Sequence, residues 1–231
     1  MSGAWLNMPL AEGLALLAFV TMWVGYAVFA KAWGKRQSSL LETTNRYRRL
    51  WMAQTAQRDP RMLDGIILQS LSQTPAFFSS TSLLVIGALF AVLGTTDKAV
   101  ELLSDIPFVQ RTSLLVFEFK LMVLVAIFVY AFFRFSWCMR QYTFVALVIG
   151  GMPPPEALQD AALRERSIDR AAALVGAAAD TFNDGLRAYY FSFAALLWLM
   201  SPLAMLLGTA VVIAILYRRE FHSEVLGILR D

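Results

Sequence analysis

Ionisable side chains that could do chemistry lie beside long uncharged stretches of this chain. Glu118 and Lys120 stand near one end of an apolar run. Either could carry an ion or a proton if it lined a wet path through a membrane. The interpretation that we favour is a helix-end acid and a lysine whose amine extends to the membrane surface. We treat Glu118 and Lys120 as a candidate polar pair on the outer side.

A second group of polar residues is predicted at the inner boundary of the apolar segments. Arg134 follows one apolar run, and Asn183, Asp184 and Arg187 precede another. Arg134 could pair with Asp184 or bind an anionic lipid headgroup. Asn183 or Asp184 could instead cap a helix that enters the membrane. The candidate lipid, anion or interhelical cluster consists of Arg134, Arg140, Asp184 and Arg187.

The scarcity of cysteine and histidine limits the chemistry. The single cysteine, Cys138, allows no internal disulfide, and the single histidine, His222, allows no paired imidazole ligands for haem or another metal. The glycines form no phosphate-binding loop, and no Ser-His-Asp set can be built around His222. We therefore predict no cofactor, no metal site, no catalytic residue and no enzymatic activity.

The composition is typical of a membrane protein. Hydrophobic residues make up 58% of the chain and charged residues 16%, with a mean hydropathy of +0.57. The net charge of +3 does not indicate nucleic-acid binding, because Lys and Arg gather beside apolar runs, as they do in cytoplasmic loops. We predict a single all-α membrane domain over residues 1–231. Its almost uncharged stretches are Gly13–Ala30, Gly65–Thr96, Leu121–Phe133 and Ala188–Tyr217.

The distribution of basic residues predicts how the chain is threaded. No Lys or Arg precedes the first apolar run, whereas Lys31, Lys35 and Arg36 follow it. This places the N-terminus outside a bacterial inner membrane. The run lacks the basic region and cleavage site of a signal peptide. The segment 94–113 has slightly more acidic than basic residues, which places it outside, with a short helix from Thr96 or Asp97 to Pro107.

Two helical segments are predicted on the cytoplasmic side, at about 39–73 and 136–182. In the first, one helix begins near Ser39 and another at Asp59-Pro60, and Thr74-Pro75 restarts the chain before the second span. Arg46, Arg48 and Arg49 make the first of these helices a candidate for lying on anionic lipid.

The third apolar run predicts an unusually long helix. No breaker interrupts the chain from Ser113 to Gly150, which allows one helix of about 37 residues and about 55 Å. Because this length exceeds a bilayer, the second half should project into the cytoplasm. An alanine-rich helix from Glu156 to about Phe182 can pack against the projecting part.

The last uncharged stretch decides the number of spans. Ser201-Pro202 lies at the middle of Ala188–Tyr217, so the stretch is either one kinked helix or a hairpin of two short helices. A hairpin returns Arg218 and Arg219 to the cytoplasm, together with the C-terminus. We predict a polytopic bundle of five spans, with four as the alternative. The spans are expected at about 10–29, 75–93, 114–135, 186–200 and 203–217.

Several sequence segments resemble the bacterial membrane family catalogued as domain of unknown function 599. They are Asn45-Arg46-x-Arg48, FFSST at Phe77–Thr81, LGTTDKAVELL at Leu93–Leu103, YAFFRFSWCMRQY at Tyr130–Tyr142, GLRAYYF at Gly185–Phe191 and YRREF at Tyr217–Phe221. The resemblance implies an integral inner-membrane protein without catalytic residues to carry over. It also implies recurrent polar positions near the cytoplasmic face, with Lys120 the exception on the outer side. These positions are Asn45, Arg46, Lys120, Arg134, Arg140, Arg187 and Arg218.

Three classes of function remain open. The first is a non-enzymatic structural or accessory subunit that acts through helix contacts with itself or with a membrane complex. Gly87 and Ala91 offer a small-residue contact face for it. The second is a channel or carrier, which requires Glu118, Lys120 and Arg134 to line one continuous path. The third is a module that binds anionic lipid. The partners expected are the lipid bilayer, anionic lipid, a second copy or a larger membrane complex, and no nucleic acid.

Overall fold

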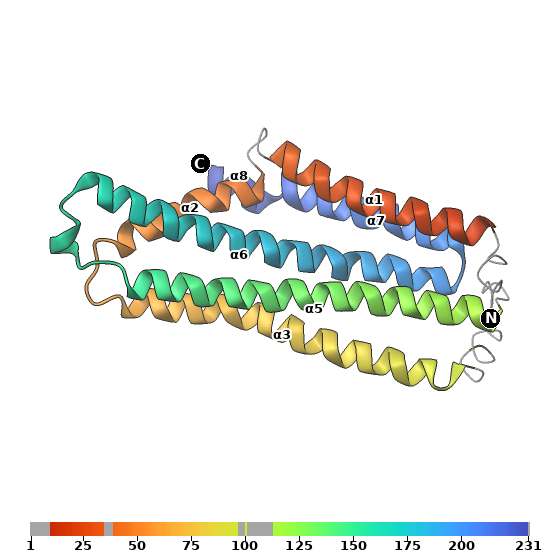
Figure 1. Cartoon of the computed structure of the whole chain (residues 1–231). Coiled ribbons are helices and arrows are strands. Elements are labelled where there is room, and N and C mark those ends of the chain that lie inside the picture. Colours follow the sequence, from red (N-terminus) through yellow and green to blue (C-terminus); the bar gives the residue numbers. More distant parts are fainter. Residues whose placement is uncertain (1–9, 35–38, 97–99, 101–112, 231) are drawn as a thin grey trace.

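The computed structural model describes residues 10–34, 39–96, 100 and 113–230, and this part of the chain is helical with no strand (Figure 1). Four helical segments are long and apolar enough to cross a membrane: Leu10–Gly34, Met62–Leu93, Leu114–Gly150 and Pro202–Arg230. The predicted all-α fold is confirmed for the described residues. The elements are α1 (Leu10–Gly34), α2 (Leu40–Thr55), α3 (Met62–Leu93), α5 (Leu114–Gly150), η2 (Pro155–Leu158), α6 (Ala161–Leu196), η3 (Leu197–Leu199), α7 (Pro202–Phe221) and α8 (Glu224–Arg230).

Side-chain caps fix where several helices begin. The hydroxyls of Ser39, Ser113 and Ser201 each accept a hydrogen bond from the backbone N–H three residues later, at 3.2, 3.4 and 3.1 Å. Such a cap satisfies a backbone donor that the first helical turn leaves free. The predicted helix start at Ser39 and the predicted 37-residue helix after Ser113 are confirmed.

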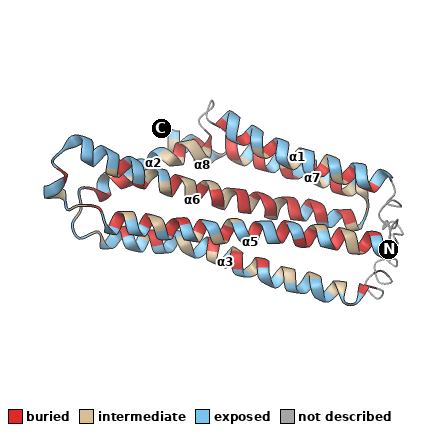
Figure 2. Ribbon diagram, viewed as in Figure 1, coloured by how far each residue is buried: buried red, intermediate tan, exposed pale blue. Residues whose placement is uncertain are grey.

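Helices α5 and α6 form the long axis of the molecule. They pack against each other, α3 lies along α5, α2 lies along the first half of α6, and α1 packs on α7. Figure 2 shows buried residues concentrated where α5 and α6 face their neighbours. One buried cluster includes Phe19, Phe191 and Trp198. A second buried cluster, around Met52 and Val145, fills the other end of the molecule.

Helices α5 and α6 are much longer than α1 and α7, which lie beside α6. Helix α5 has 37 residues and α7 has 20, which correspond to about 55 Å and about 30 Å. Figure 1 shows that α1 and α7 accompany only one half of α6, and that α2 takes their place along the other half. We call this second half the stalk. It comprises α2, residues 62–74 of α3, residues 136–150 of α5, η2 and residues 161–182 of α6.

The expected restart of the chain at Thr74-Pro75 is wrong. Helix α3 runs without interruption from Met62 to Leu93 and contains Pro75. A proline inside a helix removes one hydrogen bond. Here Leu68, Pro75, Ser79 and Ser82 are all buried. Packing of this stripe along α5 holds the two halves of α3 in one helix.

The expected helix from Glu156 to Phe182 is also displaced. A short η2 turn covers Pro155–Leu158, and Asp160 then caps α6, accepting a hydrogen bond from the Ala162 N–H at 2.9 Å. Helix α6 continues through Asn183 and Asp184 to Leu196. Neither residue caps a new helix, because the Asp184 carboxylate is occupied by cationic side chains instead.

The chain reverses direction between α6 and α7. The turn η3 and the Ser201-Pro202 pair connect the two helices, which then pack against each other. Gly208 lies at this contact, where an added Cβ would be 3.4 Å from the Ala194 Cα of α6. The segment 188–217 is therefore a hairpin and not one kinked helix. The short helix predicted from Thr96 or Asp97 to Pro107 lies almost entirely outside the described residues.

Candidate functional site

Lys120 is a buried cation at the end of the bundle where α6 turns into α7. Its amine donates to Glu12 Oε1 of α1 at 2.9 Å and to the Trp198 carbonyl oxygen of η3 at 3.0 Å. The Trp198 indole N–H donates to the other Glu12 oxygen, Oε2. Lys120 is 2% exposed and Glu12 6%. We call Glu12, Lys120 and Trp198 the outer lock.

The outer lock replaces the polar pair expected from the sequence. Lys120 bonds to Glu12 rather than to Glu118. Glu118 is half-buried and forms no ion pair within the described part of the chain. A buried ion pair stabilises a fold only where further hydrogen bonds satisfy both ions. Trp198 supplies such bonds to both, so the lock fastens α1, α5 and η3 together.

A second ionic group surrounds the carboxylate of Asp184 on α6. Arg187 donates to Oδ1 at 3.0 Å, while Lys31 of α1 donates to Oδ2 at 3.1 Å. Arg134 of α5 donates to the same Oδ2. We call Lys31, Arg134, Asp184 and Arg187 the inner cluster. It joins three helices at the level where α1 ends, and it includes the predicted pair of Arg134 with Asp184.

The inner cluster carries more positive than negative charge. Asp180, one turn before Asp184, is the nearest further acid on α6, and its Oδ1 is buried without a hydrogen-bond partner in the described structure. Burial raises the pKa of the Asp180 carboxyl, and Asp184 raises it further, against the lowering effect of Lys31, Arg48 and Arg187. Arg48, whose own pKa burial lowers, donates to Asn45 Oδ1 at 2.7 Å.

Close packing fixes the position of Asp184. A Cβ on the next residue, Gly185, would lie 2.7 Å from Phe135 Cε1 of α5, so only glycine lets α6 approach α5 this closely. Phe135 itself is fully buried and stacks on Phe78 of α3, with ring centroids 5.2 Å apart. The carboxylate of Asp184 is thereby held within reach of Arg134.

Other predicted positions lie away from the inner cluster. Arg140 is exposed and lies over the ring of Phe144, 5.5 Å from its centroid. Arg218 is exposed at the end of α7. Of the four predicted cluster residues, the structure brings together Arg134, Asp184 and Arg187. Arg140 lies six residues beyond Arg134, about 1.7 helical turns, so the two side chains leave α5 on different faces.

Hydroxyl groups of α3 bond to neighbouring helices. Ser79 pairs with Ser136 of α5 at 3.2 Å, and Ser82 pairs with the Tyr189 hydroxyl of α6 at 2.9 Å. The Tyr189 hydroxyl also contacts the Phe78 carbonyl at 3.1 Å. These bonds join α3 to α5 and to α6, as hydroxyl side chains commonly do between membrane helices.

A third buried acid lies in the stalk, where sequence reasoning assigned none. Asp64 of α3 is fully buried. Its Oδ1 accepts hydrogen bonds from Trp51 Nε1, Thr55 Oγ1 and Arg58 Nη1 at 2.7, 2.8 and 2.7 Å. This arrangement fastens α2 to α3. The only sign of this arrangement in the sequence is that the basic residue Arg58 stands six positions before Asp64.

The arrangement of these charges is suited to holding helices together. The carboxylates of Glu12, Asp64 and Asp184 each bond to side chains from another helix. The described residues contain no group of three or more His, Cys, Asp or Glu that could hold a metal ion. Cys138 is buried, with its thiol directed at the Ala178 carbonyl at 3.2 Å. The described geometry therefore offers interhelical ionic contacts rather than an activated nucleophile.

Comparison with protein families gives one match, which covers almost the whole chain. The model described as "Protein of unknown function, DUF599" matches residues 14–225. The chain belongs to this family. No curated protein and no solved structure matches. As a DUF599 member with membrane-span-like helices, it is a membrane protein of uncharacterised function.

Proposed function

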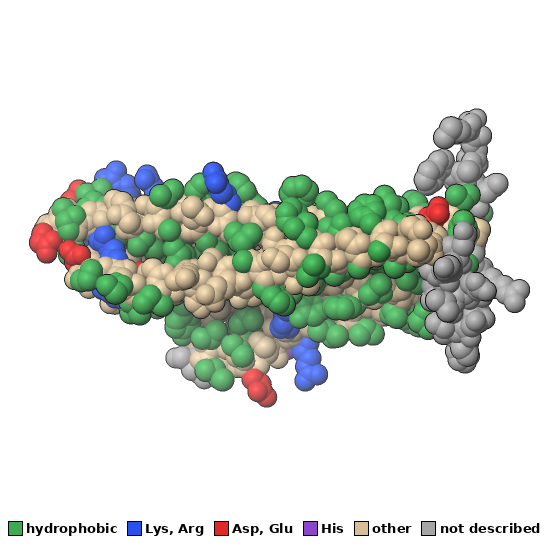
Figure 3. All heavy atoms as spheres, turned by 90° about the horizontal axis from the view of Figure 1, so that it is seen from below, with side chains coloured by type: hydrophobic (Ala, Val, Ile, Leu, Met, Phe, Trp, Pro, Cys, Tyr) green, Lys and Arg blue, Asp and Glu red, His purple; other side chains and the backbone are tan. Residues whose placement is uncertain are grey.

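We propose that this DUF599 protein crosses the bacterial inner membrane five times, with its N-terminus outside and its C-terminus in the cytoplasm. The α6–α7 hairpin supports this topology, because Ala188 to Leu199 has no charged residue and runs beside α7. Figure 3 shows a band of hydrophobic side chains between charged groups on its left and an acidic side chain at its right. In this topology, the stalk projects into the cytoplasm.

The protein's role in this proposal is non-enzymatic and accessory. The observation that carries it is the pairing of the bundle's buried charges at two separate levels. Lys120 belongs to the outer lock and Arg134 to the inner cluster, about 21 Å apart along α5 at 1.5 Å per residue. A channel or carrier would need these groups, with Glu118, on one continuous path. Their separate interhelical contacts favour a scaffold instead.

The stalk offers a surface for a protein partner. Met62, Leu63 and Ile66 of α3 are 72%, 53% and 58% exposed, and Leu147 of the adjoining α5 is 66% exposed. In the proposed topology these side chains lie outside the lipid. Apolar side chains gathered on a water-facing surface are typical of protein contacts. We expect this stalk surface to bind another component of a membrane complex.

A second copy of the chain is an alternative partner, through α3. Leu84 is 75% exposed, and an added Cβ at Gly87 would meet nothing within 4 Å. Ala91 is exposed on the same helix. Small residues let two membrane helices approach closely. This face is open for such a contact.

Site-specific photo-cross-linking in living cells tests the accessory role. A photoreactive amino acid at Ile66 should give a discrete cross-link to a different protein. The matched control is Leu207 of α7, which is 60% exposed and faces lipid in the proposed topology. It should give no such product. A third probe at Leu84 reports self-association. Absence of any protein cross-link from both Ile66 and Leu84 would overturn the proposal.

A further inference from the structure

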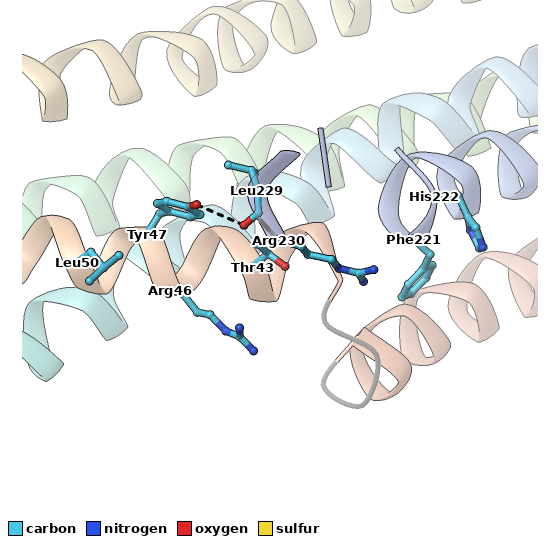
Figure 4. Close-up of a pocket in the computed structure, with 8 residues that line it drawn as sticks. All are labelled: Thr43, Arg46, Tyr47, Leu50, Phe221, His222, Leu229 and Arg230. Carbon is cyan, nitrogen blue, oxygen red and sulfur yellow. Dashed lines mark hydrogen bonds between the residues drawn. The ribbon is translucent and has the colours of Figure 1, made fainter. Parts of the chain in front are cut away.

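A cleft of about 680 Å³ lies between α2, the end of α7 and α8 (Figure 4). Arg46 and Thr43 line it from α2, His222 from the end of α7 and Arg230 from α8. The Tyr47 hydroxyl donates to the Leu229 carbonyl at 3.3 Å, which holds α8 against α2. The described lining contains basic and neutral residues and no acid.

Thr43 presents an unsatisfied hydroxyl at this cleft. The residue is 3% exposed, and its Oγ1 is buried without a hydrogen-bond partner in the described structure. Helical threonines commonly bond to the carbonyl four residues earlier. The neighbouring Thr44 does so with Leu40 at 2.9 Å, but Thr43 does not. A buried hydroxyl without a partner is unfavourable, so a ligand oxygen at this wall of the cleft would stabilise it.

Arg46 differs from the other arginines of its segment. Arg48 donates to Asn45 and Thr44, and Arg49 pairs with Glu165 and Asp169 of α6. Arg46 is exposed and forms no ion pair in the part of the chain that the structure describes. Figure 4 shows its side chain extending from the same helix as Thr43. Its guanidinium is therefore available to an anion, and arginine suits phosphate oxygens because it presents several donors.

An apolar track leads along α7 to the same cleft. Leu203, Leu207, Val211 and Ile215 follow one another at intervals of four residues and are 66%, 60%, 57% and 50% exposed. At this spacing they share one helix face. That face continues through Arg218 to His222, which lines the cleft. A lipid could place its acyl chain on the α7 track and its phosphate in the cleft, on one continuous surface. A soluble phosphate would use only the cleft.

We propose that this cleft binds the phosphate-bearing headgroup of an anionic inner-leaflet lipid, with Arg46, Arg230 and Thr43 contacting the phosphate and the α7 track contacting an acyl chain. The inference rests on the proposed membrane placement of α7. It does not depend on the stalk surface or on any protein partner.

The test measures retention of phosphatidylglycerol by the purified full-length protein in nanodiscs of phosphatidylcholine mixed with phosphatidylglycerol, using native mass spectrometry. Arg46→Gln should lower the affinity about tenfold, the effect of losing one charge-assisted hydrogen bond. Thr43→Val should also lower it, while leaving the lipid-free protein at least as stable, because valine removes the unsatisfied hydroxyl. A purely structural hydroxyl would give the opposite change in stability.

Arg140→Gln is the matched control, because it removes the same charge from an exposed position outside the cleft. It should leave phosphatidylglycerol affinity unchanged. Equal losses from Arg46→Gln and Arg140→Gln would indicate non-specific surface attraction and overturn the site. Glycerol 3-phosphate is the soluble probe. If it binds as tightly as phosphatidylglycerol, the lipid assignment is overturned, whatever the cross-linking from the stalk shows.

Discussion

The outer lock and the inner cluster both hold charged side chains between helices, but they differ in the balance of acids and bases and in exposure. The lock matches one acid with one base, and Trp198 bonds to both. The inner cluster gathers three cations on one acid, and the side chains of Lys31 and Arg134 are 53% and 28% exposed. A fully buried ion that loses its partner has nothing else to bind, whereas a partly exposed ion can be solvated by water instead. The lock should therefore be rigid and the cluster adjustable.

The largest expected effect is at the outer lock. Glu12→Ala leaves Lys120 buried and unpaired, which should lower the free energy of unfolding by about 3–5 kcal/mol. The double variant Glu12→Ala with Lys120→Met should recover much of this loss, because it also removes the stranded charge. Denaturant unfolding of the purified protein in detergent measures both. A double variant no more stable than Glu12→Ala would show that the ion pair is not the source of the loss.

The next largest effect is at the inner cluster. Asp184→Asn should lower the free energy of unfolding by about 2–3 kcal/mol, because three cations lose their shared carboxylate. Lys31→Met is the comparison, and it should cost less than about 1 kcal/mol because its amine is half-exposed. The same unfolding measurement applies. If Asp184→Asn costs more than Glu12→Ala, the contrast between the two ionic groups is wrong.

A smaller loss is expected where α6 approaches α5. Gly185→Ala places a methyl group against the ring of Phe135, and such overpacking should cost about 1–2 kcal/mol. In a Phe135→Leu background, Gly185→Ala should lower the stability less, because the added methyl group no longer meets the ring. A shift in thermal unfolding temperature reports the change. Unchanged stability in Gly185→Ala would mean that the two helices do not pack this closely.

The smallest expected effect is a gain in stability rather than a loss. Because burial raises the Asp180 pKa above its ordinary value, this carboxyl stabilises the fold at low pH, and the stability is lost as pH rises through the folded-state pKa. Asp180→Asn should therefore be more stable than the unmodified protein at neutral pH, by less than about 1 kcal/mol. The difference in stability between Asp180→Asn and the unmodified protein should disappear in acid. Destabilisation by Asp180→Asn at neutral pH would instead mean that the ionised carboxylate is bound by the cations around it.

Local signals predicted the long elements well. Ser39 and Ser113 are good N-cap residues, and the uninterrupted run to Gly150 predicted the full length of α5. Pro75 and Asp184 were misread as helix boundaries because their local preferences are outweighed by contacts made far along the chain. Pro75 is buried on the face of α3 that packs on α5, and Asp184 bonds to Arg134.

The ionic partners were predictable only in part. Arg134 and Asp184 lie at the same predicted depth, and the sequence therefore suggested their pairing. Glu12 is 108 residues from Lys120, and nothing local to either residue indicates that α1 packs beside that part of α5. Thr43 and Arg230 meet at one cleft only because α8 folds back on α2. Such juxtapositions depend on the packing of the whole bundle.

Cysteine accessibility in intact cells tests the proposed topology most directly. Gln159→Cys lies in the exposed connection before α6, and Met200→Cys lies in the α6–α7 turn. The native Cys138 is fully buried and should contribute little background. A membrane-impermeant maleimide should label Met200→Cys in spheroplasts and Gln159→Cys only after permeabilisation. Labelling of both positions from the same side would contradict the five-span topology, and labelling of Gln159→Cys in intact spheroplasts would contradict the cytoplasmic stalk.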